Sequence, residues 1–151
     1  MKPFSFRLDR VRQYRETQAR LEEAKLERLY AERRASETRR ERLNRQRADN
    51  ETALLRAPAV DSMQLAALDR FGRYVDAQNE LVARELAQVD QKVAAQRERV
   101  TDARRQHRLL EKLREKRLSA WQAEYDRELE AQAAELYLAQ WPARNALVKS
   151  E

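Results

Sequence analysis

One short segment, residues 57–62, combines a proline with helix-capping side chains and divides an otherwise helix-like chain. Pro58 lacks the backbone donor that a helix interior needs, and its ring disfavours a helical conformation for the residue before it. Asp61 or Ser62 can then cap a new helix, with Gln64 placed to complete a capping box. We therefore expect a first helix over about 5–56, a turn at 57–61, a second helix over about 62–141 and a short C-terminal tail at 142–151.

The composition on both sides of this break favours helix. The chain has 151 residues with one glycine and three prolines; 38% of its residues are charged, 7% are aromatic, and its mean hydropathy is −0.99. Ala, Leu, Arg, Glu and Gln are abundant, and they lose little side-chain freedom in a helix. Intrinsic disorder is the alternative for so charged a chain, but the regular spacing of the apolar residues argues against it. We predict an all-α protein with a single domain, residues 1–151, folded as a long antiparallel two-helix coiled-coil hairpin.

Apolar residues of the expected second helix recur at alternating spacings of three and four, as in a coiled-coil seam. An extra step of four between Val82 and Leu86 predicts a stutter. The first helix has a poorer seam, because arginine and polar residues fill most of its middle. With the turn centred on the proline segment, position i should lie opposite about 118 − i, so that residues 4–11 face residues 107–114. An aromatic overhang, Trp121 to Trp141, then extends without a partner.

Positive charge is concentrated at one end of this hairpin. The net charge of +6 comes entirely from the first 56 residues, because basic and acidic residues balance over the remainder. Residues 1–21 and 97–117 are both basic, and the expected register brings them together, whereas the chain from residue 118 onward is acidic. Solvated helix surfaces explain most of these charges, but their concentration suggests an acidic partner. Interleaved carboxylates and the lack of a stacking or zinc module argue against nucleic acid.

The residue types that catalysis and metal binding require are nearly missing. There is no cysteine, and the one histidine, His107, lies on the predicted seam. The one glycine, Gly72, stands alone, so there is no phosphate-binding loop. Adjacent carboxylates such as Glu22 and Glu23 lie on a helix surface without the pocket that acid–base catalysis requires. We expect no enzyme activity, no cofactor and no metal. No signal peptide or membrane span is recognisable, which predicts a cytosolic protein without direct membrane insertion.

Two short motifs carry a family resemblance. The chain opens with Phe4-x-Phe6-Arg7-Leu8-x-x-Val11-x-x-x-Arg15, and late in the second helix it reads Ala103-Arg104, then Leu110-Glu111-Lys112-Leu113-Arg114-Glu115-Lys116-Arg117, followed by Glu128 and Gln132. In these motifs, in its length and in its two-helix plan with a proline-containing turn, the chain resembles the FliJ family of flagellar export proteins. It departs from the family at Ala134-Glu135, where an Asp-Glu pair is common.

The resemblance implies a coiled coil that resembles the central stalk of rotary ATPases and has no catalysis of its own. It implies a component of the flagellar type III export apparatus that is cytoplasmic and peripherally associated with the inner membrane at the flagellar base. The implied partners are the hexameric flagellar export ATPase, the membrane export gate protein and export chaperones. Two alternatives stay open: the equivalent stalk of an injectisome-type secretion system, and a structural coiled coil that dimerises in parallel.

Two candidate surfaces follow. The first is an ATPase-binding end, where basic side chains surround two phenylalanines that alternatively close the hairpin as a hydrophobic clasp. Its residues are Phe4, Phe6, Arg7, Arg15, Arg104, Arg105, Arg108, Lys112, Arg114 and Lys116. The second is an export-gate face near the turn, opposite a part of the first helix that offers little apolar cover. Its residues, which alternatively belong to the coiled-coil seam, are Phe71, Val75, Gln78 and Val82.

Overall fold

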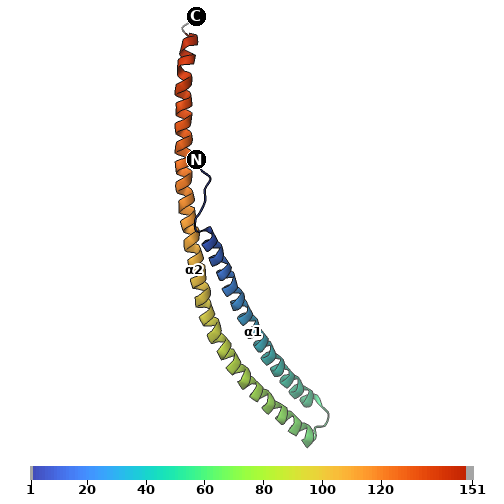
Figure 1. The fold of residues 1–151 in the computed structure, drawn as a ribbon. Helices are drawn as coiled ribbons and strands as arrows, with labels where there is room; N and C mark the ends of the chain where they lie inside the picture. The colour runs from blue at the N-terminus through green and yellow to red at the C-terminus, as the bar shows by residue number, and fades with distance from the viewer. Residues whose placement is uncertain (1, 149–151) are drawn as a thin grey trace. The chain divides into compact units, whose positions relative to one another are not determined.

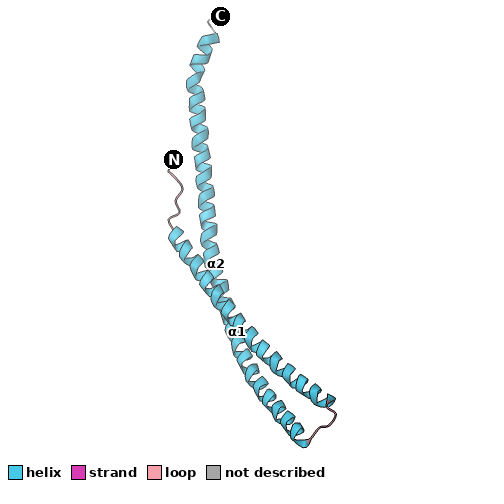
Figure 2. Cartoon of the chain, turned by 90° about the vertical axis from the view of Figure 1, so that its right-hand side faces the viewer, coloured by secondary structure: helices cyan, strands magenta, loops and turns pink. Residues whose placement is uncertain are grey.

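The computed structural model describes residues 2–148, and the side chains of residues 2–139. Two long helices, α1 (Asp9–Arg56) and α2 (Ser62–Val148), pack against each other as a helical hairpin, and residues 2–148 contain no strand (Figures 1 and 2). The prediction of an all-α two-helix hairpin is therefore confirmed.

The chain divides into two compact units, and each contains parts of both helices. Residues 17–103, which include the turn, form what we call the hairpin unit. Residues 1–16 and 104–151 form what we call the terminal unit. The candidate ATPase-binding end lies in the terminal unit, and the candidate export-gate face lies in the hairpin unit.

The turn of the hairpin unit is closed by the predicted capping box. The backbone N–H of Gln64 donates to Asp61 Oδ1 at 2.7 Å, and the backbone N–H of Asp61 donates to Gln64 Oε1 at 3.2 Å. These two bonds satisfy donors that the first turn of a helix cannot satisfy within itself. They explain why α2 begins at Ser62, immediately after the cap.

Valines of α2 form the core of the hairpin unit. The most buried of them, Val75 and Val82, are 0% and 1% exposed, and the other buried seam residues of α2 are Val89, Val93, Gln96 and Val100. Burying one valine side chain stabilises a fold by about 1.5–3 kcal/mol. From Val75 onward the seam alternates steps of four and three if half-buried Asn79 takes the place of Gln78, so the extra step of four does not fall between Val82 and Leu86. The Asn79 side chain donates to Asn44 Oδ1 at 2.8 Å.

The expected register was wrong by about one helical turn. Arg33 pairs with Asp90 at 2.8 Å, whereas the expected register placed Arg33 opposite about residue 85. Arg47 pairs with Asp76 at 2.7 Å, which gives the same offset. Figure 1 shows the reason: the first turn of α2 lies beyond the end of α1, so the turn segment is not the midpoint of the pairing.

Polar side chains of α1 form ion pairs and hydrogen bonds with α2. Besides the two pairs above, Arg39 forms an ion pair with Glu85 across the helices. Buried Gln96 donates to the backbone carbonyl of Glu22 at 3.0 Å and also to the Glu22 carboxylate. Exposed ion pairs contribute little stability, about 0–1 kcal/mol each, but each works against other registers.

In the terminal unit α1 begins at Asp9, four residues later than expected. The backbone N–H of Asp9 donates to Phe6 O at 3.0 Å, and the Asp9 carboxylate accepts bonds from Arg12 at 3.0 Å and from Gln13 at 3.2 Å. A carboxylate is favourable at a helix N-terminus, so Asp9 is a strong start signal. Residues 2–8 run beside α2 without forming a helix (Figure 1).

The end of α2 also differs from the prediction. The helix continues through Pro142 to Val148, where the sequence predicted a tail from residue 142. A proline removes one backbone hydrogen bond, and helix-forming residues on both sides allow the helix to continue past it. The last three residues of the expected tail, and the side chain of Trp141 at the end of the expected overhang, lie outside the described part.

Candidate partner-binding site in the terminal unit

An aromatic clasp, formed by Phe4, Trp121, Tyr125 and Arg114, holds the N-terminal segment on α2. The Phe4 and Trp121 rings lie 6.1 Å apart at 56°, and Trp121 stacks on Tyr125 at 5.4 Å and 8°. Trp121 Nε1 donates to the backbone carbonyl of Lys2 at 3.1 Å, and the Arg114 guanidinium lies 5.9 Å from the centre of the Phe4 ring. Such ring and cation contacts contribute about 0.5–1.5 kcal/mol each. Phe4 therefore packs within the chain, as in the hydrophobic clasp that the sequence offered as the alternative to contact with a partner.

The clasp corrects two expectations. The sequence placed residues 4–11 opposite residues 107–114, but Phe4 reaches Trp121. Trp121, expected to be the first unpartnered aromatic of the overhang, is instead covered by the N-terminal segment. Further along α2, Tyr125 is 38% exposed and Leu136 is 65% exposed, so the rest of the described overhang remains open.

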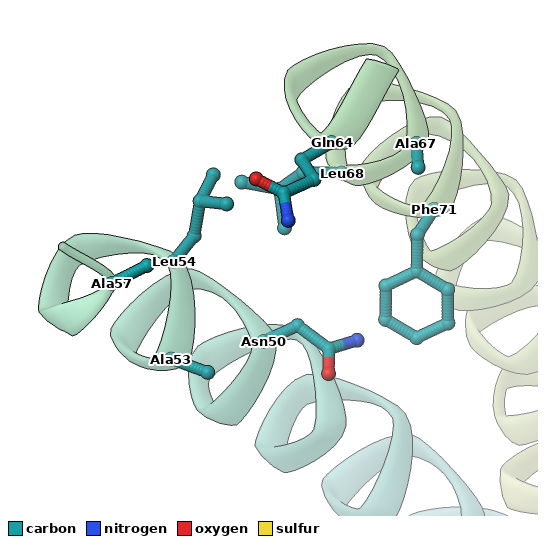
Figure 3. A pocket seen from close by; sticks show the side chains of 8 residues that line it. All are labelled: Asn50, Ala53, Leu54, Ala57, Gln64, Ala67, Leu68 and Phe71. Atoms are coloured by element: carbon teal, nitrogen blue, oxygen red, sulfur yellow. The ribbon is translucent and has the colours of Figure 1, made fainter. Parts of the chain in front are cut away.

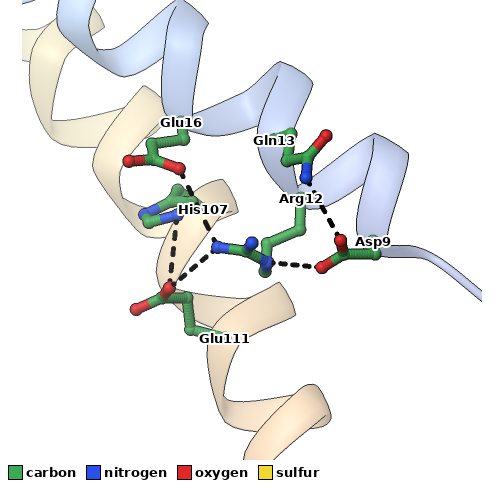
Figure 4. Close-up of polar contacts among 6 residues, drawn as sticks. All are labelled: Asp9, Arg12, Gln13, Glu16, His107 and Glu111. Atoms are coloured by element: carbon green, nitrogen blue, oxygen red, sulfur yellow. Dashed lines mark hydrogen bonds and ion pairs between the residues drawn. The ribbon is translucent and has the colours of Figure 1, made fainter. Parts of the chain in front are cut away.

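A polar cluster ties the start of α1 to α2 (Figure 4). Arg12 contacts Asp9 at 3.0 Å, Glu111 on α2 at 3.4 Å and Glu16 at 3.8 Å. The pKa of Arg12 is raised above its ordinary value, first by the hydrogen bond from its side chain to Asp9 and then by the nearby carboxylates. His107 Nε2 lies 3.5 Å from Glu111 Oε1 and has no hydrogen-bond partner within the described residues. Arg12 therefore acts as a structural cation, a role that the sequence did not identify.

Most of the predicted basic residues face solvent. Arg104, Arg108, Lys112 and Lys116, which we call the basic ridge, are spaced by four along α2 and are all exposed. Among the described residues, Arg108, Lys112 and Lys116 form no ion pair. Charges spaced in this way add their fields along one side of a helix.

The remaining predicted residues differ in their surroundings. Arg105 and Arg7 are exposed, and neither forms an ion pair within residues 2–139. Arg15 is half-buried, and its guanidinium lies 5.7 Å from the ring centre of the neighbouring Tyr14. Phe6 is half-buried and does not join the clasp.

Phe6 instead lines a hollow between the N-terminal segment and α2. This hollow has a volume of about 540 Å³ and is bounded by Ser5, Phe6, Arg7, Leu8, Leu113 and Arg117. A second hollow of about 430 Å³ shares Leu113 and Arg117 with it and reaches Trp121. We call the two together the segment groove. The sequence set omitted Arg117, although it stands in the same basic run as Lys116.

The candidate export-gate face is mostly core. Val75 and Val82 are fully buried, so the seam interpretation is correct for them and the expectation of a poorly covered face was wrong. Gln78 is half-buried beside the seam, and Phe71 is half-buried nearer the turn.

Phe71 opens instead onto a hollow near the turn (Figure 3). This turn-end hollow has a volume of about 460 Å³, and Figure 3 shows that α1 and α2 both supply its walls. Its lining residues are Asn50, Ala53, Leu54, Ala57, Gln64, Ala67, Leu68 and Phe71. Close by in sequence, Leu55 is 87% exposed and Met63 is 79% exposed. Exposed large apolar side chains around a hollow mark a candidate interaction surface.

Within the described residues, neither helix has a stretch apolar enough to cross a membrane, and no group of acidic or histidine side chains is arranged to hold a metal ion. In comparison with known proteins, no family model, no curated protein and no solved structure matches this chain.

Proposed function

We propose that this protein is a stalk-like component of the flagellar type III export apparatus, without catalysis of its own. In this proposal the terminal unit binds the hexameric export ATPase, the turn end contacts the membrane export gate protein, and the protein assists export chaperones from the cytoplasmic side of the inner membrane. The observation that carries it is the combination, in one unit of a helical hairpin, of unpaired basic side chains with the two family-like motifs.

The basic ridge suits the first contact with an acidic ring. Arg108, Lys112 and Lys116 are exposed and form no ion pair within the described chain, so their field extends into solvent. Opposite charges across an interface accelerate association and fix orientation more than they add affinity. We therefore expect ATPase binding to weaken as the salt concentration rises, because salt screens exposed charges.

For the export gate we propose the turn-end hollow in place of the buried valines. Phe71, Leu54 and Leu68 give this hollow apolar walls, and Leu55 and Met63, which are close by in sequence, are exposed apolar residues. Such a surface is suited to an apolar side chain of a partner. The valines behind it keep the two helices together.

Charge reversal in the terminal unit tests the proposal. The triple variant Arg108→Glu/Lys112→Glu/Lys116→Glu should keep its helicity, because all three side chains are exposed. Its affinity for the hexameric export ATPase at physiological salt should fall at least tenfold, since each reversal replaces attraction by repulsion. The matched control is Arg34→Glu/Arg42→Glu/Arg45→Glu, which makes the same change of charge on exposed residues of the hairpin unit. Equal affinities for the two variants, or no binding of the wild-type chain, would refute the proposal.

A further inference from the structure

The segment groove is held open because its N-terminal wall is anchored at both ends. On one side Phe4 packs on Trp121, and the carbonyl of Lys2 accepts a bond from the same indole. On the other side the backbone N–H of Asp9 bonds to Phe6 O, and Arg12 links Asp9 to Glu111 on α2. Residues 5–8 therefore span between two fixed points on α2. A groove with fixed walls binds its ligand without first having to order itself.

The lining of the groove combines apolar and basic side chains. Its apolar lining residues, which we call the floor, are Phe6, Leu8 and Leu113, and Leu8 is 39% exposed. Its basic lining residues, which we call the rim, are Arg7 and Arg117; both are exposed, and neither forms an ion pair among the residues whose side chains are described. Lys116 adds positive charge in the adjoining hollow, where Glu124 is the one acidic lining residue.

This pairing of groups favours one class of ligand. An arginine guanidinium recognises carboxylates through two parallel hydrogen bonds, which are stronger than bonds between neutral groups. An inorganic anion would leave the apolar floor unused. Single-stranded nucleic acid needs exposed aromatic rings on which to stack, but Phe6 is half-buried and Trp121 is already stacked on Tyr125. A peptide that carries both carboxylates and a bulky apolar side chain uses the rim and the floor together.

We propose that the segment groove binds an acidic peptide segment, which places one bulky apolar side chain over Leu113 and its carboxylates on Arg7 and Arg117. This inference rests on the proposed function, because we assign the segment to the export ATPase. It adds an anchored contact to the steering by the basic ridge. The apolar side chain supplies a desolvated centre, and the two arginines supply the charged border that fixes its direction.

Overlapping peptides that cover the export ATPase provide the test. Immobilised peptides are incubated with the labelled full-length chain, and the affinity of every captured peptide is then measured in solution. We expect the captured peptides to be acidic with a central Leu, Ile, Phe or Met. Replacing that apolar residue by Ser, or the carboxylates by amides, should each weaken binding at least fivefold.

Variants of the chain assign the site. Arg7→Gln/Arg117→Gln should lose peptide binding at least tenfold, whereas the control Arg42→Gln/Arg45→Gln, with the same change of charge in the hairpin unit, should change it less than threefold. Both variants should keep wild-type circular dichroism, because all four side chains are exposed. Capture of basic or uncharged peptides, or equal losses in the two variants, would overturn the groove assignment. If the intact ATPase ring still binds the wild-type chain in that case, the proposed function stands and only the groove fails.

Discussion

The hairpin unit and the terminal unit differ in how their charges are paired across the two helices. In the hairpin unit, arginines of α1 pair with carboxylates of α2, as in Arg33 with Asp90 and Arg47 with Asp76. In the terminal unit Arg12 forms such a pair with Glu111, but Arg108, Lys112 and Lys116 follow one another along α2 without an ion pair among the described residues. Paired charges cancel each other's field, whereas unpaired charges of one sign add up. The comparison indicates that charge pairs help to hold the hairpin unit together, and that the terminal unit has a run of unpaired cations suited to a partner.

The units also differ in how their apolar groups are buried. The hairpin unit buries valines at regular seam positions, and Val75 and Val82 are its most buried residues. The terminal unit relies on a few aromatic contacts, centred on Trp121, that hold a non-helical segment. Disrupting a buried valine should therefore destabilise the whole hairpin unit, whereas disrupting the aromatic contacts should release only the N-terminal segment.

The largest effect should follow from a charge in the valine seam. Val82→Asp places a carboxylate at a site that is 1% exposed, without a cation positioned for it, and should destabilise the hairpin by more than about 4 kcal/mol. The control is Leu81→Asp at the neighbouring position, because the Leu81 side chain is 49% exposed. This substitution should change the free energy of unfolding by less than about 0.5 kcal/mol. Thermal unfolding followed by circular dichroism measures both. Similar melting temperatures for the two variants would contradict the claim that Val82 belongs to the buried core.

A smaller and more local effect is expected for Trp121→Ala. The variant loses the stack on Tyr125, the contact with Phe4 and the bond to Lys2 O, together about 1–3 kcal/mol. Because these contacts hold residues 2–8, their amide hydrogens should exchange faster, while residues 75–100 keep their protection. Trp121→Phe keeps a ring without the indole donor, so its exchange rates in residues 2–8 should lie between those of the wild type and Trp121→Ala. Faster exchange throughout the hairpin unit would show that the clasp is not local.

Removing the cap of α2 should have an effect of about 1 kcal/mol. Asp61→Ala leaves the backbone N–H of Gln64 without its acceptor, which is the usual loss for a helix N-cap. Ser62→Ala is the matched control, since no side-chain hydrogen bond of Ser62 joins the cap pair. Denaturant unfolding of both variants gives the difference. If Ser62→Ala lowered the free energy of unfolding as much as Asp61→Ala does, the assignment of Asp61 as the cap would be wrong.

The smallest effect concerns pH. Hydrogen bonds from Lys25 and then from Gln96 hold the pKa of Glu22 below its ordinary value of 4.5. A depressed carboxylate pKa stabilises the fold fully above 4.5, and this contribution is lost as the pH falls through the lower folded-state pKa. The stability of Glu22→Gln should therefore depend less on pH below about 4.5 than that of the wild type. Equal pH profiles for the wild type and Glu22→Gln would exclude Glu22 as the cause.

Local chemistry could be read from the sequence, whereas relations between the helices could not. The Asp61 and Gln64 cap and the valine seam follow from side chains within a few residues of each other, and both were predicted correctly. The register depends on how the turn segment runs against the first turn of α2, which no periodicity encodes. Because the expected register was wrong, the part of α1 that lies opposite Val75 and the residue that contacts Phe4 were both predicted incorrectly.

The candidate site was predicted in part for the same reason. A basic run identifies exposed cations such as Lys112 and Lys116 without knowledge of the fold. The groove depends on residues 5–8 lying beside Leu113 and Arg117, which are more than a hundred positions away in sequence. Only the arrangement in space shows that Arg7 and Arg117 border one hollow.

Hydrogen exchange of the full-length chain, alone and bound to the hexameric export ATPase, tests most directly whether the terminal unit is the partner-binding unit. Binding should slow exchange in residues 2–16 and 104–124, where the unpaired basic side chains and the segment groove lie. Exchange in residues 24–56, where Arg33, Arg39 and Arg47 pair across the hairpin, should stay unchanged. Slower exchange confined to the hairpin unit, with residues 2–16 and 104–124 unaffected, would contradict the account.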